Sequence, residues 1–293
     1  MIDLAIIVVR LVQYAAAAVL FGLSLFFVYA RPLPRGRAIL ASAGGLLALA
    51  SLLAIGLQAS LFAGSFAQGA TVDAMADIVG YLPLGKAALV RAATAAAAFV
   101  LVLALPAGRE TWLSVAALGM VATASLAWMG HGAASDGSLG WVHLAADVLH
   151  ALSGAIWLGA LAGLAVMVCD RASRDLDTLL LALRRFSAFA PLLIAVVVLS
   201  GLVNGWVLVG PDRAFAMADT PYGQLLIVKL ILFAAMLALG AVNRWRLTPA
   251  LAADPGPAAM AQLKWSIGVE TAAGLAILGL VAWFGTLVPP AAA

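Results

Sequence analysis

Eight apolar runs, each about 20 residues or longer, divide this chain and constrain its fold more than any other feature. A run of that length crosses a membrane as a helix, because the backbone groups must then be hydrogen-bonded within the segment itself. We therefore expect an all-α fold, a polytopic membrane helical bundle of about eight transmembrane helices that forms a single transmembrane domain. No stretch alternates as a strand would. The expected spans are residues 4–30, 38–64, 86–106, 111–130, 141–168, 186–209, 223–243 and 264–287.

The composition supports a membrane protein and argues against other classes. Hydrophobic residues make up 65% of the chain and charged residues 10%, and the mean hydropathy is +1.12. The net charge of +3 does not indicate a nucleic-acid partner, since the Arg and Lys residues lie mostly in the gaps between apolar runs. The single cysteine, Cys169, excludes an internal disulfide and a CxxC metal site. Residues 65–85 are expected to form a loop with a short interfacial helix.

The charged residues of the loops predict the orientation of the chain. Basic residues gather in alternate loops, which the positive-inside rule places in the cytoplasm, while the other loops carry mainly aspartates. Both termini are therefore expected to be periplasmic, as an even number of spans requires. The basic loop residues are Arg31, Arg35, Arg37, Arg109, Arg171, Arg174, Arg184, Arg185, Arg244, Arg246 and Lys264.

Several ionisable residues lie within the expected spans, where they are costly and usually face the bundle interior. All but the last of them fall in the outer half of their spans under the predicted orientation, which indicates a site reached from outside. They are Arg10, Arg91, His143, Asp147, His150, Lys229 and Glu270.

The fifth span carries the most unusual stripe of polar residues. His143, Asp147 and His150 are spaced i, i+4 and i+7 and so share one helix face. Met129 and His131 precede this span, and thioether and imidazole ligands suit copper. We predict a metal site from these five residues. The alternatives are histidines satisfied by helix neighbours, a carboxylate that neutralises a buried cation, a packed methionine and a solvated His131.

Four further polar residues are candidates for a transport path or for structural roles. Asn204 could line a path or only join two helices by a hydrogen bond. Tyr222 and Lys229 belong to a seven-residue repeat that also fits a packing seam with a snorkelling lysine. Glu270 could be an inner gate, a proton acceptor or a buried partner for a cation.

Residues 141–246 resemble the copper resistance protein D family, CopD. His150 followed by Trp157, Leu158 and Gly159 is similar to the histidine and WxG helix of that family. The order and spacing of the later motifs carry the rest of the resemblance. These motifs are Arg185, Phe186 and Ser187, then Ser200 to Asn204, then Thr220 to Gly223 with Lys229, and then Asn243 with Arg244.

The resemblance implies a bacterial inner-membrane protein of about eight spans that serves copper uptake and tolerance, often beside a small periplasmic copper-binding protein of the CopC type. We expect no enzyme but a transporter that takes copper ions, of undetermined oxidation state, inward from the periplasm. His131 and Met129 would receive the ion, and His143, Asp147 and His150 would carry it inward. This chain has no appended CopC-like domain, so a separate partner would supply that role.

Three cations in the outer layer, Arg10, Arg91 and Lys229, outnumber Asp147 and would repel a metal ion unless they are paired or turned away. This surplus keeps a second hypothesis open, a haem- or quinone-binding redox protein whose cations hold anionic groups. Two histidines on one helix face, however, do not give opposed axial ligands to one haem. A third hypothesis is a non-transporting copper assembly or scaffold protein.

Overall fold

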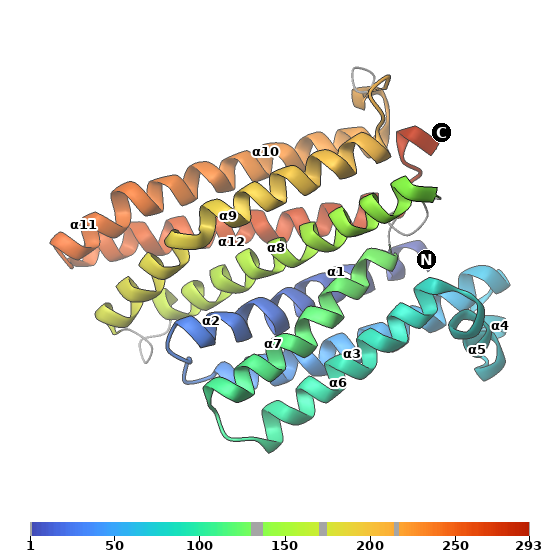
Figure 1. The fold of residues 1–293 in the computed structure, drawn as a ribbon, viewed down its shortest axis with the longest axis horizontal. Coiled ribbons are helices and arrows are strands. Elements are labelled where there is room, and N and C mark those ends of the chain that lie inside the picture. The colour runs from blue at the N-terminus through green and yellow to red at the C-terminus, as the bar shows by residue number, and fades with distance from the viewer. Residues whose placement is uncertain (1, 130–136, 170–174, 214–216, 293) are drawn as a thin grey trace.

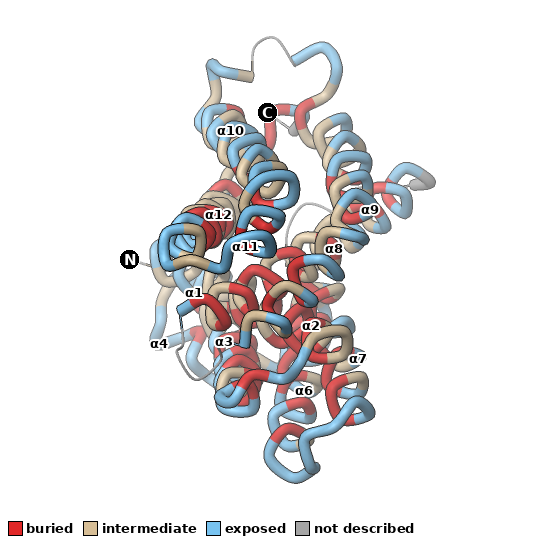
Figure 2. Tube along the Cα trace, turned by 90° about the vertical axis from the view of Figure 1, so that its left-hand side faces the viewer, coloured by how far each residue is buried: buried red, intermediate tan, exposed pale blue. Residues whose placement is uncertain are grey.

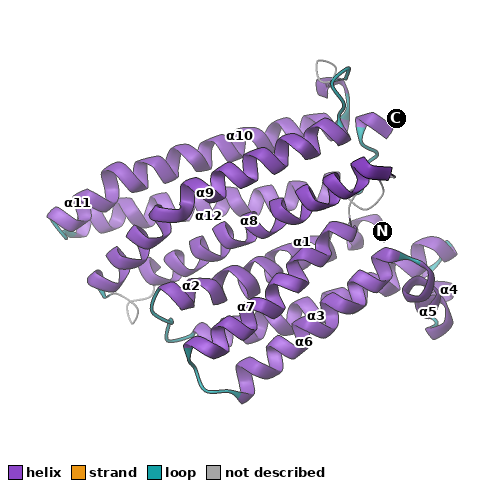
Figure 3. Ribbon diagram, viewed as in Figure 1, coloured by secondary structure: helices purple, strands orange, loops and turns teal. Residues whose placement is uncertain are grey.

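The chain folds into a bundle of long helices (Figure 3). A computed structural model describes residues 2–129, 137–169, 175–213 and 217–292, and every regular element within these ranges is helical. Eight of the helices are long and apolar enough to cross a membrane, which confirms the predicted all-α membrane bundle. The eight spans are Ile2–Tyr29, Gly36–Ala63, Pro83–Ala104, Arg109–Met129, Leu139–Cys169, Leu176–Leu208, Pro221–Ala253 and Pro257–Phe284.

The spans differ from the predicted ranges mainly where charged turns stay helical. The sixth begins ten residues earlier than expected and the seventh ends ten residues later, because helix continues through segments rich in arginine. Two spans contain a wide π-helical turn, a feature that apolar periodicity does not reveal. The first span is α1 (Ile2–Ala18), η1 (Val19–Leu23) and α2 (Ser24–Tyr29), and the seventh is α10 (Pro221–Val242), η6 (Asn243–Leu247) and α11 (Thr248–Ala253).

The remaining spans are mostly single helices. The segment between the second and third spans holds two short helices, whose first turns are capped by the hydroxyls of Ser65 and Thr71. A proline in the first turn opens the third span. The elements are α3 (Gly36–Ala63), α4 (Phe66–Gly69), α5 (Val72–Tyr81), α6 (Pro83–Ala104), α7 (Arg109–Ala124), η2 (Ser125–Met129), α8 (Gly137–Cys169), α9 (Leu176–Leu208), η5 (Met217–Asp219), α12 (Pro257–Phe284) and η7 (Pro290–Ala292).

Both chain ends lie at one end of the bundle, which we call the termini end, together with α4 and α5 (Figure 1). Arginines satisfy carbonyl groups at the opposite end. Arg37 donates to the carbonyl oxygens of Val102 at 2.7 Å and Leu103 at 3.1 Å, in the last turn of α6, and Arg185 donates to that of Tyr29 at the end of α2. A helix leaves its last carbonyls without intrahelical donors, so these arginines stabilise helix ends. Arg37 and Arg185, which the sequence predicts to lie in loops, instead lie within α3 and α9 and take part in helix packing.

The core is densest among the N-terminal helices. Buried segments gather along α1, α2, α3 and α7, whereas α10 is mostly exposed or half-buried (Figure 2). Phe26, Trp112 and Leu164 are among the large, nearly fully buried side chains of the main core. The exposed residues of α9 and α10 include Leu202 and Ile231, as expected for a surface in contact with lipid acyl chains.

A close helix contact brings two glycines together, Gly22 in η1 and Gly159 in α8. A β-carbon added at Gly159 would lie 2.3 Å from the carbonyl carbon of Gly22, and one added at Gly22 would lie 2.1 Å from the carbonyl oxygen of Ala155. Helices in membranes approach this closely only where small residues meet. This contact fixes α8 against the N-terminal half of the bundle.

Replacing Gly159 with Ala is expected to destabilise the protein by about 1–3 kcal/mol, because the two backbones must move apart. Gly154→Ala on the same helix is the matched control, since no atom lies within 4 Å of the added β-carbon. This control is expected to be neutral or stabilising by up to about 1 kcal/mol. Thermal unfolding of both purified variants checks the prediction, and equal unfolding temperatures would contradict it.

Candidate functional site

A row of polar side chains joins α8 to α9 in the half of the bundle nearer the termini. Asn204 of α9 donates from Nδ2 to Oδ1 of Asp147 at 3.2 Å. Nδ1 of His150 lies 3.1 Å from the carbonyl oxygen of Val197 and 3.1 Å from Oγ of Ser200. We call Asp147, His150, Ser200 and Asn204 the α8–α9 seam. The predicted stripe on α8 therefore faces a neighbouring helix rather than lipid.

The hydrogen bonds of His150 define which ring nitrogen can bind a ligand. The carbonyl oxygen of Val197 can only accept, and the hydroxyl of Ser200 already donates to the carbonyl oxygen of Val196 at 2.5 Å. Nδ1 of His150 must therefore carry the hydrogen, which leaves the lone pair on Nε2. A backbone carbonyl that holds one ring nitrogen in this way is the usual support for a histidine that binds metal through the other.

His143 and Asp147 complete the predicted stripe. The His143 side chain is 1% exposed, and Asp147 is half-buried. Lys229 of α10 lies near enough to Asp147 for their charges to attract, but in the described part of the chain neither residue forms a salt bridge within 4 Å. The amine of Lys229 instead lies 5.6 Å from the ring centre of Phe284, a cation–π distance.

Tyr222 lies seven residues, about two helical turns, before Lys229 on α10, and its side chain is buried. Its ring packs edge-on against Phe284, with 5.1 Å between ring centres. The same seven-residue repeat continues to Met236 and Asn243, which are likewise buried. The repeat therefore marks the inward face of α10, and Tyr222 contributes packing at the end where the seam lies.

A second buried polar group surrounds Glu270 of α12, farther along α8. Oε1 of Glu270 accepts a hydrogen bond from Nε1 of Trp157 at 3.2 Å, and Oε2 accepts one from Nδ2 of Asn243 at 3.0 Å. The carboxylate is 2% exposed, and nearby Ser266 is buried. We call Trp157, Asn243, Ser266 and Glu270 the Glu270 cluster. Its carboxylate is held by neutral donors rather than by a cation among the described residues.

The structure does not assemble the full set of predicted metal ligands. His131 lies outside the described residues, and the side chain of Met129 packs against the main core. Within the described ranges, no group of three or more His, Cys, Asp or Glu side chains is placed to hold a metal ion. A metal-binding role for His143, Asp147 and His150 therefore stays a prediction.

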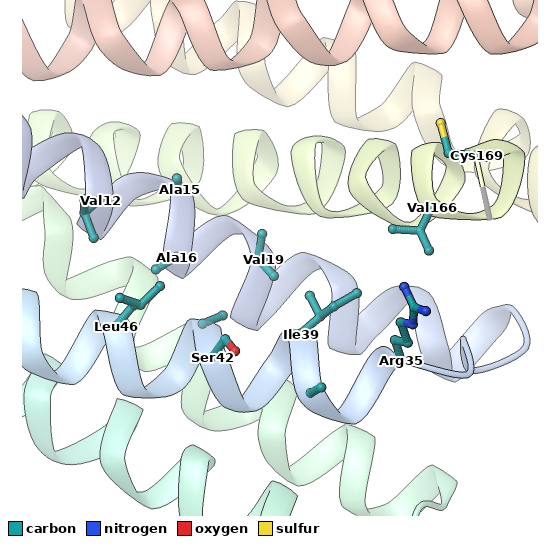
Figure 4. Close-up of a pocket in the computed structure, with 12 residues that line it drawn as sticks. Val12, Ala15, Ala16, Val19, Arg35, Ile39, Ser42, Leu46, Val166 and Cys169 are labelled. Carbon is teal, nitrogen blue, oxygen red and sulfur yellow. The ribbon is translucent and has the colours of Figure 1, made fainter.

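A cavity of about 1130 Å³ lies apart from these polar groups. It is a groove between α1, α3 and the far end of α8, lined almost entirely by apolar side chains, with Arg35, Ser42 and Cys169 as exceptions (Figure 4). Cys169 follows His150 by 19 residues, about 28 Å along a helix at 1.5 Å per residue. This thiol cannot join the seam.

Comparison with known proteins identifies the family. The family described as "Copper resistance protein D-like, N-terminal domain" matches residues 1–141, and "Copper resistance protein D" matches residues 180–284. A "Copper resistance protein D" from Pseudomonas syringae pv. tomato is 35% identical over 97% of this chain and 96% of its own length. The chain belongs to the copper resistance protein D family. No solved structure matches it.

The predicted site residues occupy different positions relative to the two matched segments of this copper resistance protein D family member. Asn204, Tyr222, Lys229 and Glu270 fall within the C-terminal match, residues 180–284. The stripe on α8 falls between the two matches, within a helix that connects the two halves. The family therefore supports a copper-related membrane role.

Sequence reasoning missed several partners that the fold supplies. Trp157 continues the stripe on α8, but its hydrogen bond to Glu270 spans 113 residues and no local pattern reveals it. Asn243 begins the π-helical turn η6, and the sequence marks it as part of a repeat and of a family-like motif but not as a partner of Glu270. Gln13 and Ser51 were not recognised at all, because single polar residues in apolar helices carry no spacing signal.

Proposed function

We propose that this protein carries copper ions across the bacterial inner membrane, inward from the periplasm, along α8. The observation that carries the proposal is the succession of buried and half-buried polar groups on this helix. His143, Asp147, His150 and Trp157 lie within 14 residues, about 21 Å at 1.5 Å per residue, a large part of a hydrocarbon core about 30 Å thick. The protein would act as a carrier, not as an enzyme.

The α8–α9 seam provides the chemistry for the outer half of this path. The Nε2 lone pair of His150 is a borderline ligand suited to copper, and Asp147 adds a negative charge close by. Oδ1 of Asn204 is buried and has no hydrogen-bond partner among the described residues, so it can supply a neutral oxygen. Met129 and His131 would deliver the ion to this seam from the periplasmic surface.

The Glu270 cluster provides the inner step. A carboxylate held by two neutral donors keeps its charge available to a passing cation, whereas a salt-bridged carboxylate would not. Copper leaving His150 would therefore move toward Glu270. Lys229 attracts Asp147 and Tyr222 packs on Phe284, so these residues would shape the outer step rather than bind the ion.

The partners follow from the same arrangement. The exposed apolar faces of α9 and α10 would contact lipid. A separate periplasmic copper-binding protein of the CopC type would bring copper to the termini end, which the positive-inside rule places in the periplasm.

Copper accumulation in proteoliposomes tests the proposal. Purified protein reconstituted into phospholipid vesicles is expected to accumulate external copper faster than protein-free vesicles, with Cu(I) and Cu(II) assayed separately. Cys169→Ser serves as the matched control and is expected to transport normally, because Cys169 lies outside the path. Copper binding without accumulation would overturn transport and favour a scaffold role.

A further inference from the structure

A small cavity with four polar side chains in its lining lies between the N-terminal helices. Its volume is about 160 Å³, and α1, α3, α6 and η2 contribute its walls. Four of its polar side chains come from different turns of these helices, and none of the residues that line it is acidic. These four are Arg10, Gln13, Gln58 and Arg91.

Arg91 is the most deeply buried cation of this cavity, with an exposed fraction of 0%. Its Nε donates to Oγ of Ser51 at 3.2 Å, and its Nη1 donates to the carbonyl oxygen and Oγ of Ser125, both at 3.2 Å. Nη2 is buried and has no hydrogen-bond partner among the described residues. A guanidinium that is held only by neutral oxygens in a membrane span is costly to bury, and a bound anion would stabilise it strongly.

Arg10 adds a second guanidinium to the same cavity. Its Nη2 donates to the carbonyl oxygen of Met129 at 3.0 Å, and its Nη1 is buried without a partner in the part of the chain that the structure describes. No carboxylate of the described residues lies within 4 Å of either arginine. The cavity therefore carries two positive charges with nothing negative in contact.

Gln13 limits which kind of anion could bind in the cavity. It is 0% exposed, and its Nε2 donates to the carbonyl oxygen of Ala50 at 3.2 Å and lies 3.4 Å from Oγ of Ser51. That carbonyl can only accept, and Oγ of Ser51 donates to the carbonyl oxygen of Leu47 at 2.6 Å, so the amide cannot be reversed. Oε1 of Gln13 is thus a buried acceptor that has no donor among the described residues.

We propose that this cavity binds a small oxyanion that carries a hydrogen, of the hydrogen-phosphate type, between Arg10 and Arg91. The oxygens would accept from the two guanidiniums, whose planar donors match tetrahedral and planar oxyanions, and the hydroxyl would donate to Gln13. The cavity volume of about 160 Å³ corresponds to about five waters. This space holds such an anion but not a whole lipid. The phosphate could belong to a free ion or to a lipid headgroup.

This site explains the surplus of cations in the outer layer without involving copper. Arg10 and Arg91 would be neutralised by the oxyanion on the α1, α3 and α6 side, leaving Asp147 for the seam. The inference does not depend on copper transport, so the two can fail independently.

Thermal unfolding of the full chain in phosphatidylcholine nanodiscs tests the proposal. Inorganic phosphate is titrated in one arm, and phosphatidic acid is added to the discs in the other. Saturable stabilisation by phosphate identifies a free ion, and saturable stabilisation by phosphatidic acid alone identifies a headgroup. Sulfate, which carries no hydrogen at neutral pH, is expected to bind at least tenfold more weakly than phosphate.

Three variants keep the test decisive. Arg91→Met is expected to weaken phosphate binding at least tenfold. Because this variant could fail to fold, Gln58→Glu is made in parallel. It would place a carboxylate in the cavity, raise the unfolding temperature in the absence of phosphate and remove the response, whereas Gln58→Leu would retain it. Neither probe stabilising the wild-type protein, or an equal response in Gln58→Glu, would overturn the proposal.

Discussion

Glu270→Gln is expected to reduce copper uptake about 100-fold or more while leaving copper binding at the seam intact. A unit charge at about 4 Å from a cation contributes about 4 kcal/mol at an effective dielectric constant of 20. The substitution removes this attraction but keeps the shape of the side chain. Initial rates of copper accumulation in proteoliposomes, with binding to detergent-purified protein measured alongside, check the prediction.

The structure indicates that Glu270→Gln will fold. An amide oxygen can still accept from Nε1 of Trp157. Asn243 can rotate its amide to accept from the new NH2 group, since its Oδ1 has no partner among the described residues. Glu270→Asp, which keeps the charge, is the control and is expected to retain more uptake than Gln. Uptake by Glu270→Gln at the wild-type rate would remove Glu270 from the path.

His150→Ala is expected to lower both copper affinity and uptake about 100-fold, because it removes the Nε2 lone pair that the seam presents. Loss of a residue that only hydrogen-bonds to a metal ligand typically costs about 10–100-fold in metal affinity, so loss of the ligand itself is expected to cost about 100-fold or more. Copper binding to purified protein and uptake into vesicles are measured together. A variant that binds and transports normally would exclude His150 as a ligand.

Ser200→Ala is the matched control for His150. It removes one of the two acceptors near Nδ1 and leaves the carbonyl oxygen of Val197, so the hydrogen stays on Nδ1. Copper affinity is expected to fall less than about tenfold. A loss equal to that of His150→Ala would mean that both changes act through helix packing.

The membrane fold was predictable because it depends on runs of apolar residues. Each of the eight spans is recognisable from the length and apolar composition of its run, and the face of α8 with His143, Asp147 and His150 follows from helical spacing. The π-helical turns were not predictable, since Val19–Leu23 reads as ordinary apolar helix.

The partners of the polar residues could not be predicted, because they depend on helix packing between distant segments. His150 meets Ser200 and Asp147 meets Asn204 only because α8 lies against α9. One interpretation of Asp147 from the sequence is that it neutralises a buried cation. In the structure, its hydrogen-bond donor is the neutral amide of Asn204. Likewise, Arg91 donates to serine and backbone oxygens rather than to a carboxylate.

The path along α8 is tested most directly by locating copper in a crystal of copper-loaded Glu270→Gln, in which the inner step is blocked. Anomalous diffraction at the copper edge is expected to show a peak about 2 Å from Nε2 of His150, a distance typical of imidazole ligands to such metals. A peak only at Cys169, or elsewhere away from His150 and Asp147, would contradict the account.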